Sequence, residues 1–230
     1  MTSKIGYLFK LFPKINWLKT LRFNLHYFKL SVALRLPALV YWRTKFNSME
    51  GTVKLCGKVR TGMLRIGVPY IGVQDHRYSR TIWQLRGGVI INKLANFGRG
   101  SRVCVEPQAE LSLGKCFNVT GDATFICRNK IQFGDDCLVS WDVQIMDTDL
   151  HKIVNLDNKE KEINPDRPIM IGNRVWIGCR STILKGSMIP DGSILAAGSL
   201  VTSHLEQVNT VYGGQGKEIK PLKNNVGWVL

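Results

Sequence analysis

Three ionisable side chains stand close together in a polar stretch of this 230-residue sequence: Asp147, Asp149 and His151. An imidazole, whose ordinary pKa is about 6.5, is well matched to take the proton of a hydroxyl group as that oxygen attacks an electrophile. A carboxylate or a backbone carbonyl on the other ring nitrogen would hold the imidazole in the required tautomer. His151 is therefore a candidate for acid–base chemistry, with Asp149 or Asp147 as its candidate partner.

The elements that would position these residues follow a repeat of six residues. Residues 171–206 divide without gaps into IGNRVW, IGCRST, ILKGSM, IPDGSI, LAAGSL and VTSHLE. Each unit begins with an aliphatic residue, and each of the first five has a small or β-branched residue four places later. The same period occurs upstream at Leu113, Val119, Phe125, Ile131, Cys137 and Val143. This regularity predicts a solenoid.

A period of six with one obligatory aliphatic position describes a short strand followed by a corner. Three such units close a triangular coil, with the aliphatic residues stacked along its interior. Neighbouring coils then hydrogen-bond as parallel strands, and glycines such as Gly186 and Gly192 relieve strain at the corners. The sequence therefore predicts a mainly β protein built as a parallel β-helix, although the period alone leaves its hand open.

The period breaks between Val143 and Ile171. The segment that interrupts the repeats, at about 147–168, is polar and charged, and His151 stands near its start. A solenoid accommodates insertions as loops that leave one face, and that face is often where it binds a ligand. The position of His151 at the root of the loop favours a catalytic role over a structural one.

The first fifth of the chain has a different pattern. Apolar residues recur at spacings of three and four, which predicts one apolar face of a helix; they are Ile15, Leu18, Leu21, Leu25 and Phe28. Nine Lys or Arg precede the first acidic residue, Glu50, and the whole chain has a net charge of +15. Two hypotheses remain open: the apolar face packs on the body of the protein, or it lies on an anionic membrane surface.

These patterns divide the chain into four parts. We expect a basic amphipathic helical segment at 1–50, irregular opening coils or a cap at 51–96, a β-helix domain with its loop at 97–221, and a tail at 222–230. The longest apolar stretch is too short for a spanning helix, no signal peptide is evident, and the six scattered cysteines are typical of a reducing compartment. We therefore expect the protein to be cytoplasmic, with peripheral attachment to the inner face of the membrane as an open hypothesis.

The stretch DTDLH, the loop, and then RPIMIGNRVWIGCRSTILKGSMIPDGSILAAGSLVTSHL closely resembles the bacterial hexapeptide-repeat acyltransferases, especially the sugar and polysaccharide O-acetyltransferases. The resemblance covers about 97–221. It implies a left-handed β-helix, a homotrimer, and active sites between subunits, where the loop of one subunit covers the coil of the next. It also implies acetyl-CoA as acyl donor and His151 as general base.

The same resemblance implies a set of coenzyme contacts along the coils beside the loop. A tryptophan would line the cleft, three small residues would contact the pantetheine arm, and a basic residue would reach the phosphates. The matching positions are Trp176, Cys179, Ala197, Thr202 and Lys217. The sequence departs from the family pattern at Ala196, Ser203 and Gln215, where the family more often has Gly, a basic residue and Pro.

The expected function is transfer of an acetyl group from acetyl-CoA to a hydroxyl of a sugar or surface polysaccharide precursor. An antibiotic or amino-acid acetyltransferase and a noncatalytic β-helix scaffold remain as alternatives. No metal site is expected, because metal-finger spacing is lacking and one of the four histidines lies near the loop. No nucleic-acid partner is expected either, because the positive charge occurs without a recognisable reader motif.

Overall fold

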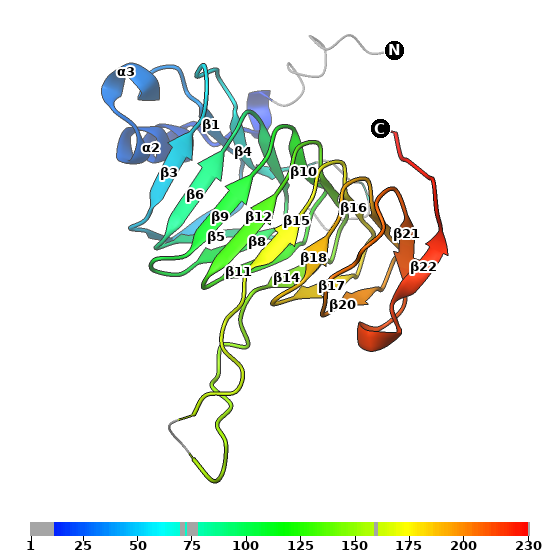
Figure 1. Ribbon diagram of the computed structural model, residues 1–230. Coiled ribbons are helices and arrows are strands. Elements are labelled where there is room, and N and C mark those ends of the chain that lie inside the picture. The colour runs from blue at the N-terminus through cyan, green and yellow to red at the C-terminus, as the bar shows by residue number, and fades with distance from the viewer. Residues whose placement is uncertain (1–11, 70–71, 73–77, 159–160, 230) are drawn as a thin grey trace.

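The computed structural model describes residues 12–69, 72, 78–158 and 161–229 of the chain. Their strands form three sheets that are visited in turn, so that the chain winds as a three-sided parallel β-helix (Figure 1). Parallel pairing joins each strand to those of the neighbouring coils, and one pair at the carboxyl end is antiparallel. The parallel β-helix predicted from the repeat is confirmed.

The strands are as follows. The first sheet contains β1 (Ala38–Val40), β4 (Leu64–Val68), β7 (Ala95–Gly98), β10 (Phe117–Val119), β13 (Leu138–Val139), β16 (Trp176–Ile177), β19 (Ile194–Leu195), β21 (Val211–Gly213) and β22 (Lys220–Lys223). The second contains β2 (Thr44–Met49), β5 (Thr81–Leu85), β8 (Arg102–Val105), β11 (Thr124–Cys127), β14 (Gln144–Met146), β17 (Thr182–Leu184) and β20 (Leu200–Val201). The third contains β3 (Thr52–Leu55), β6 (Gly88–Ile91), β9 (Glu110–Leu113), β12 (Lys130–Phe133), β15 (Ile169–Ile171) and β18 (Met188–Ile189).

The first position of each six-residue unit points into the prism. All six aliphatic residues of the second block are buried: Ile171, Ile177, Ile183, Ile189, Leu195 and Val201. They stack by register, as in the second sheet, where Ile145, Ile183 and Val201 are paired on successive strands. The interior is therefore the ladder of like residues that the sequence predicted.

The small residue of each unit lies at a corner and is buried there. Ser187, Ser193 and Ser199 donate hydrogen bonds from Oγ to the carbonyl oxygen three residues earlier, at 2.6, 2.7 and 2.7 Å. These bonds satisfy carbonyl groups that turn away from the strand ladders. Gly192 has a φ of +68°, and a Cβ there would lie 2.0 Å from Oδ1 of Asn209, so this corner requires glycine.

The coils begin earlier than the six-residue period suggests. Strands β1 and β2 occupy residues 38–49, which the sequence analysis assigned to a helical segment, and β3 to β6 lie within 51–96 in register with later coils. The connections between these first strands vary in length, for example between β3 and β4 and between β4 and β5. Because the variable connections shift the phase of the aliphatic residues, the period is hidden although the architecture is the same.

The described residues also form four short helices: η1 (Phe12–Lys14), α2 (Trp17–Tyr27), α3 (Leu30–Ala33) and η2 (Gly216–Glu218). Helix α2 covers the amino-terminal end of the β-helix (Figure 1). Asn24 donates from Nδ2 to the carbonyl oxygen of Ala38 at 2.8 Å, and its Oδ1 accepts from the Ala38 N–H at 3.0 Å. Oγ1 of Thr20 accepts from the Val40 N–H at 3.0 Å. These side chains satisfy backbone groups of β1, the edge strand of the first sheet.

The predicted apolar face of α2 is not the face that packs. The residues that it buries are Thr20, Phe23 and Asn24, whereas Leu18, Leu21 and Leu25 are exposed. The helix does lie against the body of the protein, as one hypothesis stated, but the assignment of its leucines to that contact is wrong. Hydrogen bonding to the edge strand decides the orientation, because it requires polar side chains on the packed face.

Replacing Asn24 by leucine should therefore destabilise the protein. The change leaves the buried N–H and C=O of Ala38 without partners, and each such loss costs about 1–3 kcal/mol. Urea denaturation of the variant should show a lower midpoint with an unchanged slope. Leu21→Asn, on the exposed face of the same helix, is the control and should stay within about 0.5 kcal/mol of the parent. Equal stability of the Asn24 variant and this control would contradict the capping role.

Candidate active site

The loop that carries His151 leaves the β-helix between β14 and β15, at the edge where the second and third sheets meet, and projects away from the body (Figure 1). The His151 side chain is exposed and lines a depression at the root of this loop. The lining residues are Arg128, Leu150, His151, Lys152, Glu162, Pro165 and Asp166. Leu150 has a φ of +63°, and Oγ1 of Thr148 accepts a hydrogen bond from its N–H at 2.9 Å. The chain therefore turns sharply just before the histidine.

Asp147 is fully buried beneath the loop root. Its Oδ1 accepts from the N–H of Arg128 at 2.7 Å, and its Oδ2 accepts from the N–H of Asn129 at 2.9 Å. Burial raises the pKa of Asp147, while these hydrogen bonds act in the opposite direction. The carboxylate thus holds the corner that follows β11, and Nη1 of Arg128 in turn donates to the carbonyl oxygen of Leu150 at 3.3 Å.

Asp149 lies in a second cluster that ties the two ends of the loop together. Its Oδ2 accepts from Nζ of Lys185 at 2.6 Å and from Nδ2 of Asn164 at 2.7 Å. Nδ2 of Asn164 also donates to the carbonyl oxygen of His151 at 2.9 Å. The hydrogen bond from Lys185 lowers the pKa of Asp149. Its stabilising effect is present above the ordinary carboxyl pKa and is lost as the pH falls through the lowered value.

In the described part of the chain, neither carboxylate has a hydrogen bond to the His151 ring. Asn164 links Asp149 to the backbone carbonyl of His151. Arg128 links Asp147 to the backbone carbonyl of Leu150, the residue before the histidine. Sequence reasoning missed Asn164 and Lys185, which lie 13 residues from His151 and 36 residues from Asp149, respectively. The sequence shows Lys185 as the single basic residue of the unit ILKGSM, but only the structure shows that its side chain is 11% exposed.

Two of the residues implied as coenzyme contacts meet at one corner. The N–H of Gly198, next to Ala197, donates to the carbonyl oxygen of Cys179 at 2.9 Å. Nε2 of Gln215 donates to the carbonyl oxygen of Gly198 at 2.6 Å, which brings the closing turn, with Lys217 in η2, against the same coil. This corner joins the first and second sheets, whereas the loop of His151 leaves from another edge of the prism.

Thr202 and Trp176 occupy other positions. Thr202 follows β20 at the far end of the second sheet, beside Gly216. Trp176 lies on β16 with its Nε1 donating to Oγ of Ser140 at 3.0 Å. The ring of Trp228, from the carboxyl-terminal tail, lies 6.3 Å from the ring of Trp176 between centroids, and its Nε1 donates to the carbonyl oxygen of Arg174 at 2.8 Å. Sequence reasoning assigned no role to Trp228.

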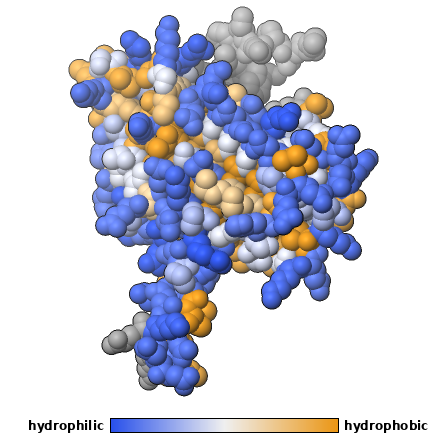
Figure 2. All heavy atoms as spheres, in the orientation of Figure 1, coloured by the Kyte–Doolittle hydropathy of each residue, from blue (hydrophilic) through white to orange (hydrophobic). Residues whose placement is uncertain are grey.

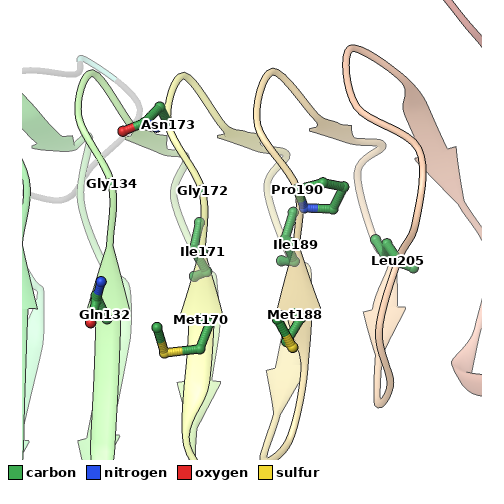
Figure 3. A pocket seen from close by; sticks show the side chains of 10 residues that line it. All are labelled: Gln132, Gly134, Met170, Ile171, Gly172, Asn173, Met188, Ile189, Pro190 and Leu205. Atoms are coloured by element: carbon green, nitrogen blue, oxygen red, sulfur yellow. The ribbon is translucent and has the colours of Figure 1, made fainter.

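A further groove runs along the outside of the third sheet, where the side chains of Gln132, Met170 and Met188 lie in a row on neighbouring strands (Figure 3). None of its lining residues is titratable. This groove therefore offers no side chain that could accept a proton. Among the described residues, no group of three His, Cys, Asp or Glu side chains is placed to hold a metal ion.

The fold and the loop-root histidine define the class: a parallel β-helix with a candidate acid–base group where a long loop leaves the coils. A solved structure with this architecture is the polysialic acid O-acetyltransferase OatWY, which superposes with a TM-score of 0.53 and 20% identity over 81% of this chain and 91% of that chain. The predicted left-handed parallel β-helix is confirmed.

Sequence comparison finds bacterial O-acetyltransferases among the relatives. The chain is 39% identical to the polysialic acid O-acetyltransferase of Neisseria meningitidis over 79 residues, which are 34% of each protein. It is 31% identical to the galactoside O-acetyltransferase of Escherichia coli K12 over 112 residues, 46% of this chain and 54% of that protein. The polysialic acid O-acetyltransferase of Escherichia coli O1:K1 is 29% identical over 156 residues, 68% of this chain and 44% of that protein.

The predicted resemblance to hexapeptide-repeat acetyltransferases is therefore confirmed: polysialic acid and galactoside O-acetyltransferases are homologues of this chain. The matched part of the chain spans from about a third to about half of the length of these relatives. No family model matches the chain.

Proposed function

We propose that this protein transfers an acetyl group from acetyl-CoA to a hydroxyl of a sugar or surface polysaccharide precursor. The observation that carries the proposal is the exposed His151, held at the root of the loop by the cluster of Asp149, Asn164 and Lys185. This arrangement occurs on a chain whose relatives are named as sugar and polysaccharide O-acetyltransferases. A free imidazole beside an open depression is available to an incoming hydroxyl group.

The proposed reaction transfers an acetyl group from the sulfur of a thioester to the oxygen of a hydroxyl group. The acceptor oxygen attacks the thioester carbonyl carbon while His151 takes the hydroxyl proton. The carbon–sulfur bond then breaks, the acetyl ester forms, and the proton on the imidazole passes to the departing coenzyme A thiolate. A backbone N–H of a neighbouring coil is the proposed donor to the oxyanion between these steps.

We propose a homotrimer with each site shared between subunits. The depression that His151 lines contains none of the five residues proposed for the coenzyme, Trp176, Cys179, Ala197, Thr202 and Lys217. A second copy of the chain would supply them. We also propose that the enzyme works in the cytoplasm, where acetyl-CoA and sugar precursors are available.

Oligomer size and subunit mixing test the shared site together. Sedimentation equilibrium should give about three times the 26.0 kDa chain mass. His151→Ala and Trp176→Ala proteins, each weakly active alone, should regain activity when their subunits are mixed and reassembled, because some mixed interfaces then carry both native residues. A fully active monomer, or mixed trimers no more active than their parents, would contradict a shared site.

The activity itself is tested by release of coenzyme A thiol from acetyl-CoA. The acceptor panel should include a sialic acid oligomer and a neutral galactoside, and the +15 net charge favours the anionic member. Thiol release that depends on the acceptor, with an acetylated sugar as product, is the expected result. Release with a small antibiotic or amino acid alone would support the alternative acceptors, and no release with any acceptor would support a noncatalytic scaffold.

A further inference from the structure

Helix α2 presents leucines on the side opposite to the one that packs. Leu18, Leu21 and Leu25 are 84%, 46% and 48% exposed. With a helical repeat of about 3.6 residues, these three positions share one face and lie across the axis from Phe23, which is fully buried. Leu30 and Leu34, which begin and follow α3, are also exposed. We refer to these five residues as the leucine face.

The fold does not account for the leucine face. Helix α2 contacts the β-helix through Thr20, Phe23 and Asn24, with hydrogen bonds to β1 and aromatic contacts with Phe46 and Trp83. Lys19 and His26 add hydrogen bonds to backbone oxygens of β2, and none of these contacts uses a leucine. An exposed leucine contributes little to stability, and polar residues would serve equally well at these positions of the helix. Scattered exposed leucines are ordinary, but five in a segment of seventeen residues, three of them on one face of α2, favour an apolar environment.

The charged residues of the segment that carries the leucine face have one sign. Arg22, Lys29 and Arg35 are exposed beside the leucines, and Lys14 is exposed just before the helix. No acidic residue occurs in residues 12–49 of the sequence. In Figure 2, hydrophobic residues interspersed with hydrophilic ones cover the region of α2 and α3. Two of the nine amino-terminal cations, Lys4 and Lys10, lie outside the described residues.

We propose that the leucine face and its cations dock this protein on a membrane surface that contains anionic lipid. The leucines enter the boundary between headgroups and acyl chains, and the guanidinium and ammonium groups remain at the lipid phosphates. No helix in the described ranges is both long and apolar enough to cross a bilayer. This inference goes beyond the proposed acetyl transfer and does not depend on it.

Flotation of the full chain with lipid vesicles tests the proposal. The parent protein should bind vesicles of equimolar phosphatidylcholine and phosphatidylglycerol at low salt, and should bind phosphatidylcholine vesicles much more weakly. The variant Leu18→Ser/Leu21→Ser/Leu25→Ser should bind the anionic vesicles at least about tenfold more weakly, because it removes most of the inserted apolar area. The matched control removes three exposed apolar side chains elsewhere and should bind as the parent does: Leu156→Ser/Val208→Ser/Val229→Ser.

A second pair of variants tests the charges. Arg22→Gln/Lys29→Gln/Arg35→Gln should weaken binding at low salt and reduce its dependence on salt, because exposed charges interact over about 10 Å at 0.1 M ionic strength. The control, Lys54→Gln/Arg102→Gln/Lys220→Gln, removes the same net charge elsewhere and should change binding much less.

Three results would overturn the proposal. The first is a parent protein that ignores anionic vesicles at low salt. The second is a leucine variant that binds them as strongly as the parent. The third is a parent protein that does not bind vesicles but self-associates without lipid, in a way that the leucine variant abolishes. A second copy of the chain would then cover the leucine face. The substituted residues of the leucine and charge variants are exposed on α2 or beside α3, so their folding and their rate of thiol release in solution should match the parent.

Discussion

Replacing His151 by alanine should lower the turnover number by about 10²–10⁴-fold, the usual contribution of a general base. The affinity for acetyl-CoA should be nearly unchanged, because His151 is proposed to act on the acceptor hydroxyl, and the residues proposed to hold the coenzyme do not line the depression that His151 lines. Single-turnover thiol release measures the chemical step directly, and titration of the coenzyme with the variant measures binding. A large loss in rate without a loss in affinity is the signature of a group that acts on the acceptor hydroxyl.

His204→Ala is the matched control. His204 is exposed in the last repeat and stands outside the proposed site, so its removal should leave both quantities as in the parent. Retained turnover in the His151 variant would reject this residue as the base. Equal losses in both variants would show that the assay reports general damage and not proton transfer.

Replacing Ile183 by aspartate should have the largest effect on stability. The side chain is fully buried and lies in register between Ile145 and Val201 in the second sheet. The variant places a carboxylate with no partner in a column of aliphatic side chains, at a cost of at least about 4 kcal/mol. Because a domain has only about 5–15 kcal/mol of stability in total, we expect little soluble folded protein.

Two further variants keep this result interpretable. Ile183→Ala removes the same side chain without adding charge and should lose about 2–5 kcal/mol in a urea titration. Thr182→Asp adds the same charge one residue earlier, on the outside of the strand, and should change stability by about 0.5 kcal/mol or less. Melting temperatures near that of the parent for both Ile183 variants would contradict the inward assignment of the first position in each repeat.

The sequence by itself determined the core of the β-helix from its first complete repeats onward. The buried position of each six-residue unit can be predicted from the sequence, because an aliphatic residue that points inward recurs at a fixed interval and pairs with its counterpart in the next coil. Val201 and Ile183 could therefore be assigned to one column without coordinates. The loop could be found for the same reason, since an excursion of polar residues breaks that interval at one place.

The tertiary structure decided everything that depends on partners distant in the sequence. Asp147 faces the corner after β11, and Asp149 pairs with Lys185, yet the two carboxylates are two residues apart and looked equivalent as partners of His151. Hydrogen bonds across 19 and 36 residues make the difference, and no local pattern encodes them.

Helix α2 shows the same limit most clearly. Its hydrophobic periodicity predicted that Leu18, Leu21 and Leu25 share a face, and that part was right, whereas Ile15 lies before the helix and is buried and Phe28 lies after it and is half-buried. Which face would turn inward depended on the backbone groups of β1, which pairs with β4 on one side. On its other side no further strand of the described residues extends the sheet, and its backbone groups bond to Asn24 and Thr20 instead. Periodicity shows which residues share a face of one helix. Which of its faces packs against the β-helix is decided by the unpaired backbone N–H and C=O groups of the neighbouring strand.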